Sequence, residues 1–302
     1  MTVLVVGSAH LDICIRPHTE PDFSELGADI PSIAQFAVGG TAFNIAKNLA
    51  LLGRDAALYT HLRAGSPTST LILDACCDAN IDTKYIQHDE TLQESCFVAI
   101  LKKENVRTAF TSTSIETATL HTTLLEKAIS SACVVVIDCN LINAQIHQIF
   151  AICRKYKRPI VISGTSSAKS RRYLSDDIVS TSSRCSLVSM NMDEAWTITP
   201  HISTLLSKND HNTILELFHS ENLIVSWDVS GYFIVNCSGV FFVEPFGLSP
   251  EGCNSTLGAG DALLSAYCAN IKDHRTIDLD KSLECARTLI QRTLFEITAT
   301  TP

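Results

Sequence analysis

The second half of the chain alternates short, almost wholly apolar runs with longer segments whose apolar residues recur every three or four positions. Short apolar runs are typical of strands buried on both faces, and the longer segments are typical of amphipathic helices. This alternation predicts a parallel sheet with helices on both faces, which is an α/β fold. The predicted strands are 134–138, 160–163, 186–190 and 223–226, the predicted helices are 143–156, 192–199 and 211–220, and an antiparallel strand pair is expected at 233–235 and 240–243.

The first half of the chain opens with the same kind of apolar run and then becomes more polar. Residues 3–7 predict a buried strand, 58–61 a second strand and 69–80 a helix. Apolar residues share one helical face between positions 45 and 52, and Gly53 follows them. Glycine directly after a helix is a common stop signal, so we expect a helix that ends at this point.

Two further segments predict a small second sheet. Residues 95–101 and 106–110 are rich in strand-forming residues and flank a polar stretch, which indicates a β-hairpin. The proline-containing segment before Gly39 predicts a crossover with an edge strand at each end. We expect these segments, about 13–38 and 94–112, to form a lid inserted in a single domain that comprises all 302 residues.

Charge and hydropathy exclude some partners. The chain has 23 Lys plus Arg against 32 Asp plus Glu, a formal charge of −9, and no basic block, so we expect no nucleic-acid partner. No apolar run reaches the roughly 18 residues that a membrane span needs, and the first residues lack a basic leader. We therefore expect a soluble, cytoplasmic protein that acts on a small molecule.

Cysteine is abundant, but the spacing of the cysteines does not indicate a disulfide framework. The 12 cysteines are scattered, none forms Cys-x-x-Cys, and several lie in apolar runs, so we interpret them as buried, reduced thiols. The ten histidines show no paired metal spacing.

A glycine-rich turn at 258–260 leads directly into an apolar helix. Such a turn aims backbone N–H groups and the positive end of the helix dipole at one point, which attracts phosphate. Asp261 lies in the first helical turn, where a carboxylate can act as a base beside the bound anion. The pattern indicates phosphoryl transfer to a hydroxyl group. The alternative is an ordinary glycine turn with a helix-capping aspartate.

Two N-terminal positions are candidates for holding substrate hydroxyls. Asp12 follows the first strand, and ligands bind at the carboxyl ends of strands in open α/β sheets. Asn44 follows the paired Gly39 and Gly40, which permit close backbone approach, and its amide can both donate and accept hydrogen bonds. The alternatives are a turn-stabilising aspartate and a capped core helix.

Three motifs in this order resemble the ribokinase-like, or PfkB, family of carbohydrate and nucleoside kinases. They are Gly39-Gly40-x-x-x-Asn44, Asn191-Met192-Asp193-Glu194 and Ser255-Thr256-Leu257-Gly258-Ala259-Gly260-Asp261. The resemblance covers nearly the whole chain and implies a three-layer α/β/α domain with a small β-sheet lid. It also implies ATP and Mg²⁺ as cofactors and allows a homodimer formed through the lid.

The resemblance assigns roles by position. It implies Asp261 as catalytic base, with Gly258, Ala259 and Gly260 forming the anion hole. Residues implied to bind substrate are Asp12, Gly40, Asn44 and Asn140, and residues implied to bind the nucleotide are Asn191, Glu194, Ser226, Gly231 and Thr256. No direct metal ligand is implied, since Mg²⁺ would be held through water near Asn191 and Glu194.

Within the family the chain most resembles pseudouridine kinases. The similarity lies in residues 7–13 and 44–53, in the strand that ends Asp138-Cys139-Asn140, and in Ser166 and Lys169. It predicts transfer of phosphate to the 5′ hydroxyl of a ribose-containing nucleoside. The alternatives are a kinase for a free sugar such as ribose or fructose or for another nucleoside, and a non-catalytic relative that binds a sugar or nucleoside. A Rossmann oxidoreductase would need a glycine fingerprint after the first strand, which Gly7-Ser8-Ala9-His10 does not supply.

The chain departs from the family pattern at the nucleotide side. Trp227-Asp228-Val229-Ser230-Gly231 replaces a glycine-rich loop, which predicts loose ATP binding and use of GTP. Ser255 replaces the usual acidic residue or Asn, so a monovalent-cation site is in doubt. Ser163-Gly164 stands where related kinases tend to have Asp-Pro.

Overall fold

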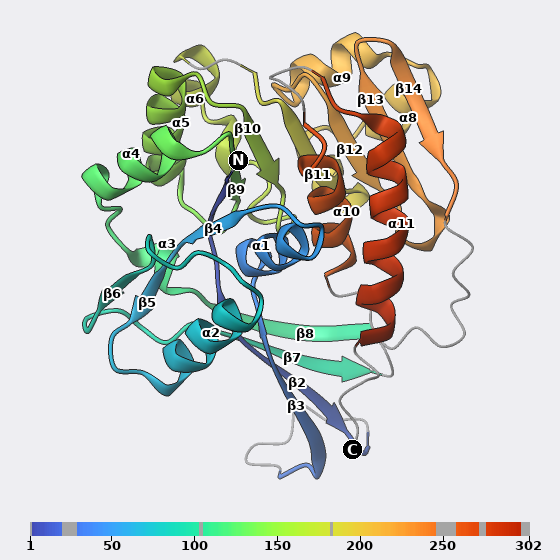
Figure 1. Ribbon diagram of the computed structural model, residues 1–302. Helices are drawn as coiled ribbons and strands as arrows, with labels where there is room; N and C mark the ends of the chain where they lie inside the picture. The colour runs from blue at the N-terminus through green and yellow to red at the C-terminus, as the bar shows by residue number, and fades with distance from the viewer. Residues whose placement is uncertain are drawn as a thin grey trace.

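The computed structural model describes residues 2–19, 29–102, 105–181, 184–245, 258–271 and 276–296. A central eight-stranded sheet in the order β14-β13-β12-β11-β10-β9-β1-β4 organises the molecule (Figure 1). Its strands are β1 (Val3–Val6), β4 (Ala56–Tyr59), β9 (Val134–Asp138), β10 (Ile160–Ser163), β11 (Leu187–Asn191), β12 (Leu223–Ser226), β13 (Tyr232–Asn236) and β14 (Gly239–Val243). The strands from β4 to β12 are parallel, and β13 and β14 are antiparallel. The predicted strands and the late antiparallel pair are confirmed.

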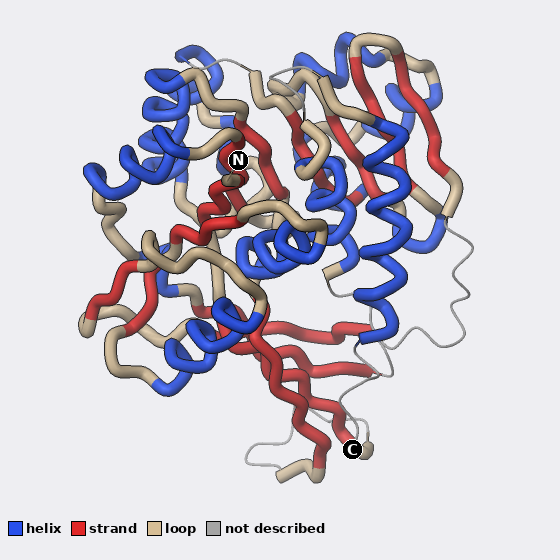
Figure 2. The backbone as a smooth tube through the Cα atoms, in the orientation of Figure 1, coloured by secondary structure: helices blue, strands red, loops and turns tan. Residues whose placement is uncertain are grey.

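Helices cover both faces of this sheet, which gives the three-layer α/β/α architecture that was expected (Figures 1 and 2). One face is covered by α1 (Thr41–Leu51), α2 (Pro67–Asp78), α10 (Ala259–Cys268) and α11 (Leu279–Glu296). The other face is covered by α4 (Thr122–Ser131), α5 (Asn143–Tyr156), α6 (Asp176–Thr181), α7 (Met192–Ile198), α8 (Ile202–Ser207) and α9 (His211–Leu217). Three short segments complete the described helices: α3 (Ser114–Thr117), η1 (Arg172–Leu174) and η2 (Asp228–Ser230).

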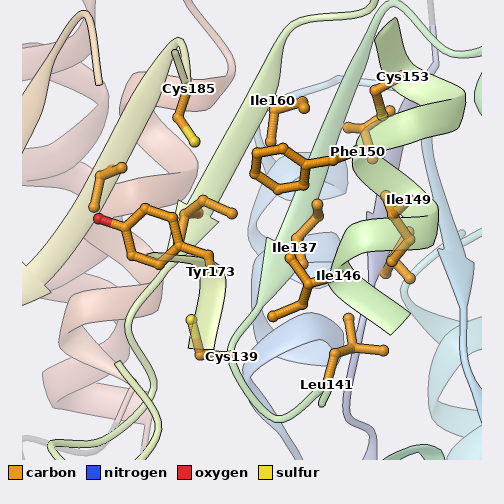
Figure 3. Close-up of a cluster of buried hydrophobic side chains, with 14 of the residues drawn as sticks. Ile137, Cys139, Leu141, Ile146, Ile149, Phe150, Cys153, Ile160, Tyr173 and Cys185 are labelled. Carbon is orange, nitrogen blue, oxygen red and sulfur yellow. The ribbon is translucent and has the colours of Figure 1, made fainter. Parts of the chain in front are cut away.

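Each face of the sheet has its own apolar core because its strands are buried on both sides. Figure 3 shows part of the core under α5, where Phe150 and Ile146 lie beside Ile137 and where Tyr173 lies between Cys139 and Cys185. Burying one such large apolar side chain contributes about 1.5–3 kcal/mol. These two cores hold the carboxyl ends of the strands in a fixed row.

A separate four-stranded sheet has the order β3-β2-β7-β8 and lies below the central sheet in Figure 1. Its strands are β2 (His10–Pro17), β3 (Ser32–Gly39), β7 (Cys96–Lys102) and β8 (Asn105–Ser112). The predicted hairpin is confirmed as β7 and β8, and β2 pairs in parallel with β7. Of the segment expected between these N-terminal strands, residues 20–28 lie outside the described residues.

The position of Asp12 differs from the expectation. Asp12 was expected in the loop after β1, but it lies inside β2, opposite Ala37 of β3 and Phe97 of β7. The reason is that Leu11, Ile13 and Ile15 alternate with polar residues, a period of two that is typical of a strand with one buried face. Asp12 therefore projects from the small sheet rather than from the central one.

Several surface features bear on the remaining expectations. None of the cysteines in the described ranges forms a disulfide, although Cys77 and Cys237 are exposed rather than buried. No helix in the described part of the chain is both long and apolar enough to cross a membrane.

The small sheet exposes the apolar side chains of Phe36 and Phe110. A homodimer formed through this sheet stays a prediction. β5 (His61–Arg63) and β6 (Gln87–Asp89) form a two-stranded sheet of their own.

Candidate active site

The N-terminus of α10 forms the expected glycine turn. Gly258 precedes the helix with φ 82°, a left-handed conformation that glycine adopts without strain. A Cβ on Gly258 would meet only ordinary contacts, so the backbone conformation and not the space requires glycine here. A Cβ on Gly260 would meet nothing within 4 Å, so the space in front of the first turn stays open. The turn therefore places backbone N–H groups at a helix N-terminus, which is an arrangement that can bind phosphate.

Asp261 is held beside this turn by a side chain from the other end of the chain. Asn44 Nδ2 of α1 donates to Asp261 Oδ2 at 2.9 Å. Burial raises the pKa of Asp261 to about 7, the hydrogen bond from Asn44 opposes that rise, and the charges of Asp138, Glu194 and Asp12 add to it. A carboxylate with a pKa near neutrality can take a proton from a hydroxyl group at physiological pH.

The paired glycines position α1 and Asp12. A Cβ on Gly39 would lie 2.1 Å from Asp12 Oδ2, and a Cβ on Gly40 would lie 2.6 Å from the Ser8 carbonyl oxygen. Gly40 has φ 101°, and the N–H of Asn44 donates to its carbonyl oxygen at 2.8 Å. Glycine at position 39 leaves room for the Asp12 side chain, and glycine at position 40 lets the start of α1 lie against the backbone of Ser8 and Ala9.

The aromatic rings of His10 and Phe97 line the same side. His10 Nδ1 lies 2.8 Å from Asp12 Oδ1, and its ring stacks on Phe97 with centroids 5.9 Å apart. Both residues come from the small sheet, as does Thr111 of β8, which also lines the cavity described below. The two aromatic rings next to the Asp12 carboxylate form a surface that suits a planar group.

A fully buried polar cluster fixes the orientation of Asn140. Asp138 Oδ2 accepts hydrogen bonds from the Ser8 N–H and hydroxyl, both at 2.8 Å, and Asp138 Oδ1 accepts from the Asn140 N–H at 3.0 Å. Asn140 Nδ2 donates to Ser8 Oγ at 2.9 Å. A Cβ on Gly7 would lie 2.3 Å from the Asp138 carboxyl carbon, so glycine at position 7 makes room for this cluster.

Asn191 and Glu194 form a capping box at the start of α7. The Glu194 N–H donates to Asn191 Oδ1 at 2.8 Å, and the Asn191 N–H donates to Glu194 Oε2 at 3.0 Å. Burial raises the pKa of Glu194 to about 7, against the hydrogen bond from the Asn191 N–H and with the charge of Asp193 adding to the rise. A Cβ on Gly164 would lie 2.5 Å from Glu194 Oε2, so glycine at position 164 leaves room for this carboxylate.

The loop after β12 is the least enclosed part of the site. Ser226 Oγ donates to the Met190 carbonyl oxygen at 3.5 Å, and the side chain of Trp227 is 48% exposed. Asp228 has φ 44°, a left-handed conformation that aspartate tolerates better than most residues. A Cβ on Gly231 would lie 2.3 Å from the Val243 carbonyl oxygen, so this glycine is required by packing against β14.

One cavity of about 390 Å³ brings most of the predicted residues together. Its described lining includes ten of them, namely Asp12, Gly40, Asn44, Asn140, Asn191, Glu194, Ser226, Gly258, Gly260 and Asp261. Ala259 and Gly231 are not part of that described lining, and Thr256 and Ser255 lie outside the described residues. Reasoning from the sequence missed His10, Phe97 and Thr111, whose signal was the alternating pattern of the strands that carry them.

A three-layer α/β/α fold with an open glycine turn at a helix N-terminus, a carboxylate whose pKa is near neutrality and a polar cavity beside it is the arrangement expected of a small-molecule phosphotransferase. The pfkB family of carbohydrate kinases matches residues 2–291. The chain belongs to this family, and it is an ATP-dependent kinase of the sugar and nucleoside class.

Solved structures share the fold at low sequence identity. A ribokinase from Arabidopsis thaliana complexed with ribose and ATP has a TM-score of 0.74 at 17% identity, covering 97% of this chain and 91% of that chain. An adenosine kinase from Sinorhizobium meliloti has a TM-score of 0.74 at 17% identity, covering 97% and 93%. A ribokinase from Thermotoga maritima has a TM-score of 0.75 at 15% identity, covering 97% and 93%. No curated protein sequence matches the chain.

Proposed function

We propose that this kinase phosphorylates the 5′ hydroxyl of a ribose-containing nucleoside with ATP as donor, and that pseudouridine is the best candidate acceptor. The observation that carries the proposal is the hydrogen bond between Asn44 and Asp261 beside the open glycine turn, in the same cavity as Asp12. This arrangement puts a base, a phosphate site and a hydroxyl-binding group within one small space.

The roles follow from the chemistry of each group. Asp12 and Asn44 hold ribose hydroxyls, and Asp261 takes the proton from the primary hydroxyl as that oxygen attacks the terminal phosphorus in line. The backbone amides at 258–260 stabilise the charge on the transferring group. Asn44 bridges the two tasks, since its bond to Asp261 aligns the base with the ribose that the same side chain contacts.

The residues present fit a magnesium ion near α7. The Glu194 carboxylate is buried, forms no ion pair with a described Lys or Arg, and has a pKa raised to about 7, which is the state expected of an uncompensated charge. Asn191 and Glu194 would hold the hydrated ion through water. When bound, Mg²⁺ would neutralise charge on the phosphates of the nucleotide.

A nucleoside is favoured over a free sugar by the aromatic rings on the acceptor side. His10 and Phe97 stack on each other and line the cavity next to Asp12. Aromatic faces stack on nucleobases, whereas a free pentose has no planar group to use them. The similarity of residues 7–13 and 44–53 to pseudouridine kinases narrows the proposal to that nucleoside. The second candidate is a free sugar, which the fold shared with ribokinases favours.

The test is ATP consumption by the purified protein with a panel of nucleosides and pentoses. We expect the highest kcat/KM with a nucleoside and at least tenfold less with ribose or fructose. Highest turnover with a free pentose would assign the second candidate. Binding of nucleosides without any turnover would instead indicate a non-catalytic relative.

A further inference from the structure

Thr165 differs from the other residues that line the cavity because its backbone is strained. It follows β10 and has φ 69°, in the left-handed region that a β-branched residue rarely adopts. Among the non-glycine residues with positive φ in the described part of the chain, Thr165 alone is β-branched. Strain of this kind persists only where the surrounding structure holds it, and it is concentrated at functional sites.

The strain belongs to a tight turn in the wall of the cavity. The Ser166 N–H donates to the Gly164 carbonyl oxygen at 2.8 Å, which closes a γ-turn with Thr165 at its centre. With positive φ at the centre, this is the rarer and more strained of the two forms of γ-turn. The N–H groups of Lys169 and Ser170 then donate to the Ser166 carbonyl oxygen, so a helical turn follows at once. The γ-turn thus replaces a straight continuation of β10 by a corner.

The Thr165 hydroxyl ties this corner to the end of β9. Its Oγ1 accepts from the Cys139 N–H at 2.9 Å and donates to the Ser163 carbonyl oxygen at 3.2 Å. The Cys139 N–H also reaches the Ser163 carbonyl oxygen at 3.1 Å, so it keeps a partner when the hydroxyl is removed. The hydroxyl is therefore not needed to satisfy a buried backbone group, and what it adds is a fixed position for the turn.

The other side of the corner lies against β11 and α7. The Gly164 N–H donates to the Ser189 carbonyl oxygen at 3.0 Å. A Cβ on Gly164 would also lie 2.9 Å from Met190 Cγ, in addition to its close approach to Glu194. Gly164 is thus fixed against β11 and the Glu194 carboxylate, while Thr165 is fixed to the end of β9.

The corner therefore sets the spacing between two parts of the site. Cys139 is followed by Asn140, which belongs with Asp12 to the acceptor end of the cavity. Glu194 belongs with Ser226 to the nucleotide end. Transfer in line requires the acceptor oxygen and the phosphorus to be held close together, and a misplacement of about 1 Å can lower the rate about 100-fold.

We propose that Thr165 is a positioning residue for phosphoryl transfer, whose hydroxyl holds a strained γ-turn that fixes Asn140 relative to Glu194. It acts through these two residues and sets the rate of transfer rather than the binding of either substrate. The proposal rests on the part of the proposed function that concerns transfer from ATP, and not on the identity of the acceptor.

The test compares Thr165→Val, which keeps the shape of the side chain and removes the hydroxyl, with Thr165→Ser, which keeps the hydroxyl. The assay uses ATP and whichever nucleoside or pentose the unmodified protein turns over fastest. We expect Thr165→Val to lower kcat about 10- to 100-fold, as for a small misplacement of the reacting groups. The dissociation constants of the acceptor and of a non-hydrolysable ATP analogue, measured by calorimetry, should change by less than about threefold. Thr165→Ser should restore most of the lost rate.

A second pair of variants isolates the strain. Thr165→Gly relaxes the backbone and removes the hydroxyl, so it should lower kcat as Thr165→Val does, because a relaxed turn no longer fixes the spacing. The matched control is Lys157→Gly. Lys157 has φ 51° at the end of α5 and is not part of the described lining of the cavity. Its replacement should leave kcat unchanged.

Two results would overturn the proposal. Normal kcat in Thr165→Val would show that the hydroxyl positions nothing. A loss of kcat that is the same in Thr165→Val and Thr165→Ser, together with an equal loss of substrate binding, would assign Thr165 a structural role alone. Fastest turnover with a pentose would contradict only the proposed acceptor, and no turnover of any acceptor by the unmodified protein would contradict both proposals.

Discussion

Next to β1 and β9, the polar side chains of the site are buried and bonded to one another, whereas in the loop after β12, outside the described lining of the cavity, the side chains are exposed. Ser8 and Asp138 are fully buried, and Asn140 is nearly so. Trp227, Asp228 and Ser230 are exposed. A closed network of hydrogen bonds fixes side-chain positions, and fixed positions discriminate between ligands. The difference therefore predicts that the enzyme selects strictly among acceptors and tolerates different nucleotides.

The largest loss of activity is expected at Asp261, where the acceptor end and the nucleotide end of the site meet. Asp261→Asn should lower kcat about 10²–10⁴-fold, the range for loss of a positioned general base, with little change in acceptor binding. In the unmodified enzyme kcat/KM should rise with pH through a midpoint near 7, because the base works deprotonated and its pKa is raised to about 7. Steady-state kinetics from pH 5 to 9 measure both. Near-normal turnover of the variant would remove Asp261 from the chemistry.

The acceptor end should respond next. Asp12→Ala should raise the KM of the acceptor about 10- to 100-fold, since a carboxylate bonded to hydroxyls contributes about 1.5–3 kcal/mol. The KM for ATP should stay the same, because Asp12 lies in the small sheet away from β12. Calorimetry with the acceptor checks the binding directly, and an unchanged dissociation constant would show that Asp12 serves only to pair with His10.

The nucleotide end should discriminate poorly between purines. We expect kcat/KM for GTP within about tenfold of the value for ATP, because a loop with an exposed tryptophan supplies few buried donors or acceptors to read the edge of the base. Parallel assays with both nucleotides at saturating acceptor measure the ratio. A preference for ATP above about 100-fold would mean that this end is as selective as the acceptor end.

The smallest effect is expected at Asp228. Asp228→Asn removes one exposed charge and should lower the KM for ATP about twofold, the repulsion of one charge across about 10 Å of water. Asp228→Gly should add a gain in thermal stability, since glycine adopts a φ of 44° without strain. Comparing the two variants separates the effect of the lost charge from the effect of the changed backbone conformation. An unchanged KM in both would show that Asp228 faces solvent and not the nucleotide.

The same contrast explains what could be predicted from the sequence. Local patterns were sufficient to predict α5, which matches the expected range 143–156. They also predicted the end of α1 before Gly53, which has φ 72°. They were also sufficient for motifs whose residues lie within one turn, such as Asn191 with Glu194.

Local sequence patterns did not predict the features that depend on contacts with residues far away in the sequence. Asp12 was expected just after the first strand and the segment that follows it was expected to supply an edge strand, yet β2 already begins at His10 and lies between β3 and β7. The orientation of Asn140 depends on Ser8, 132 positions away, and no local rule contains that contact. Long-range packing overrides local preference at such points.

The bond between Asn44 and Asp261 joins residues separated by 217 positions. A ribosome that adds about 5–20 residues per second needs about 10–40 s to make the chain between them. During that time the strands from β4 to β14 are made and can pair with β1, which is already present, but Asn44 has no carboxylate to align. The unfinished chain can thus acquire a folded sheet while it still lacks its base, so phosphoryl transfer cannot begin before α10 has been made.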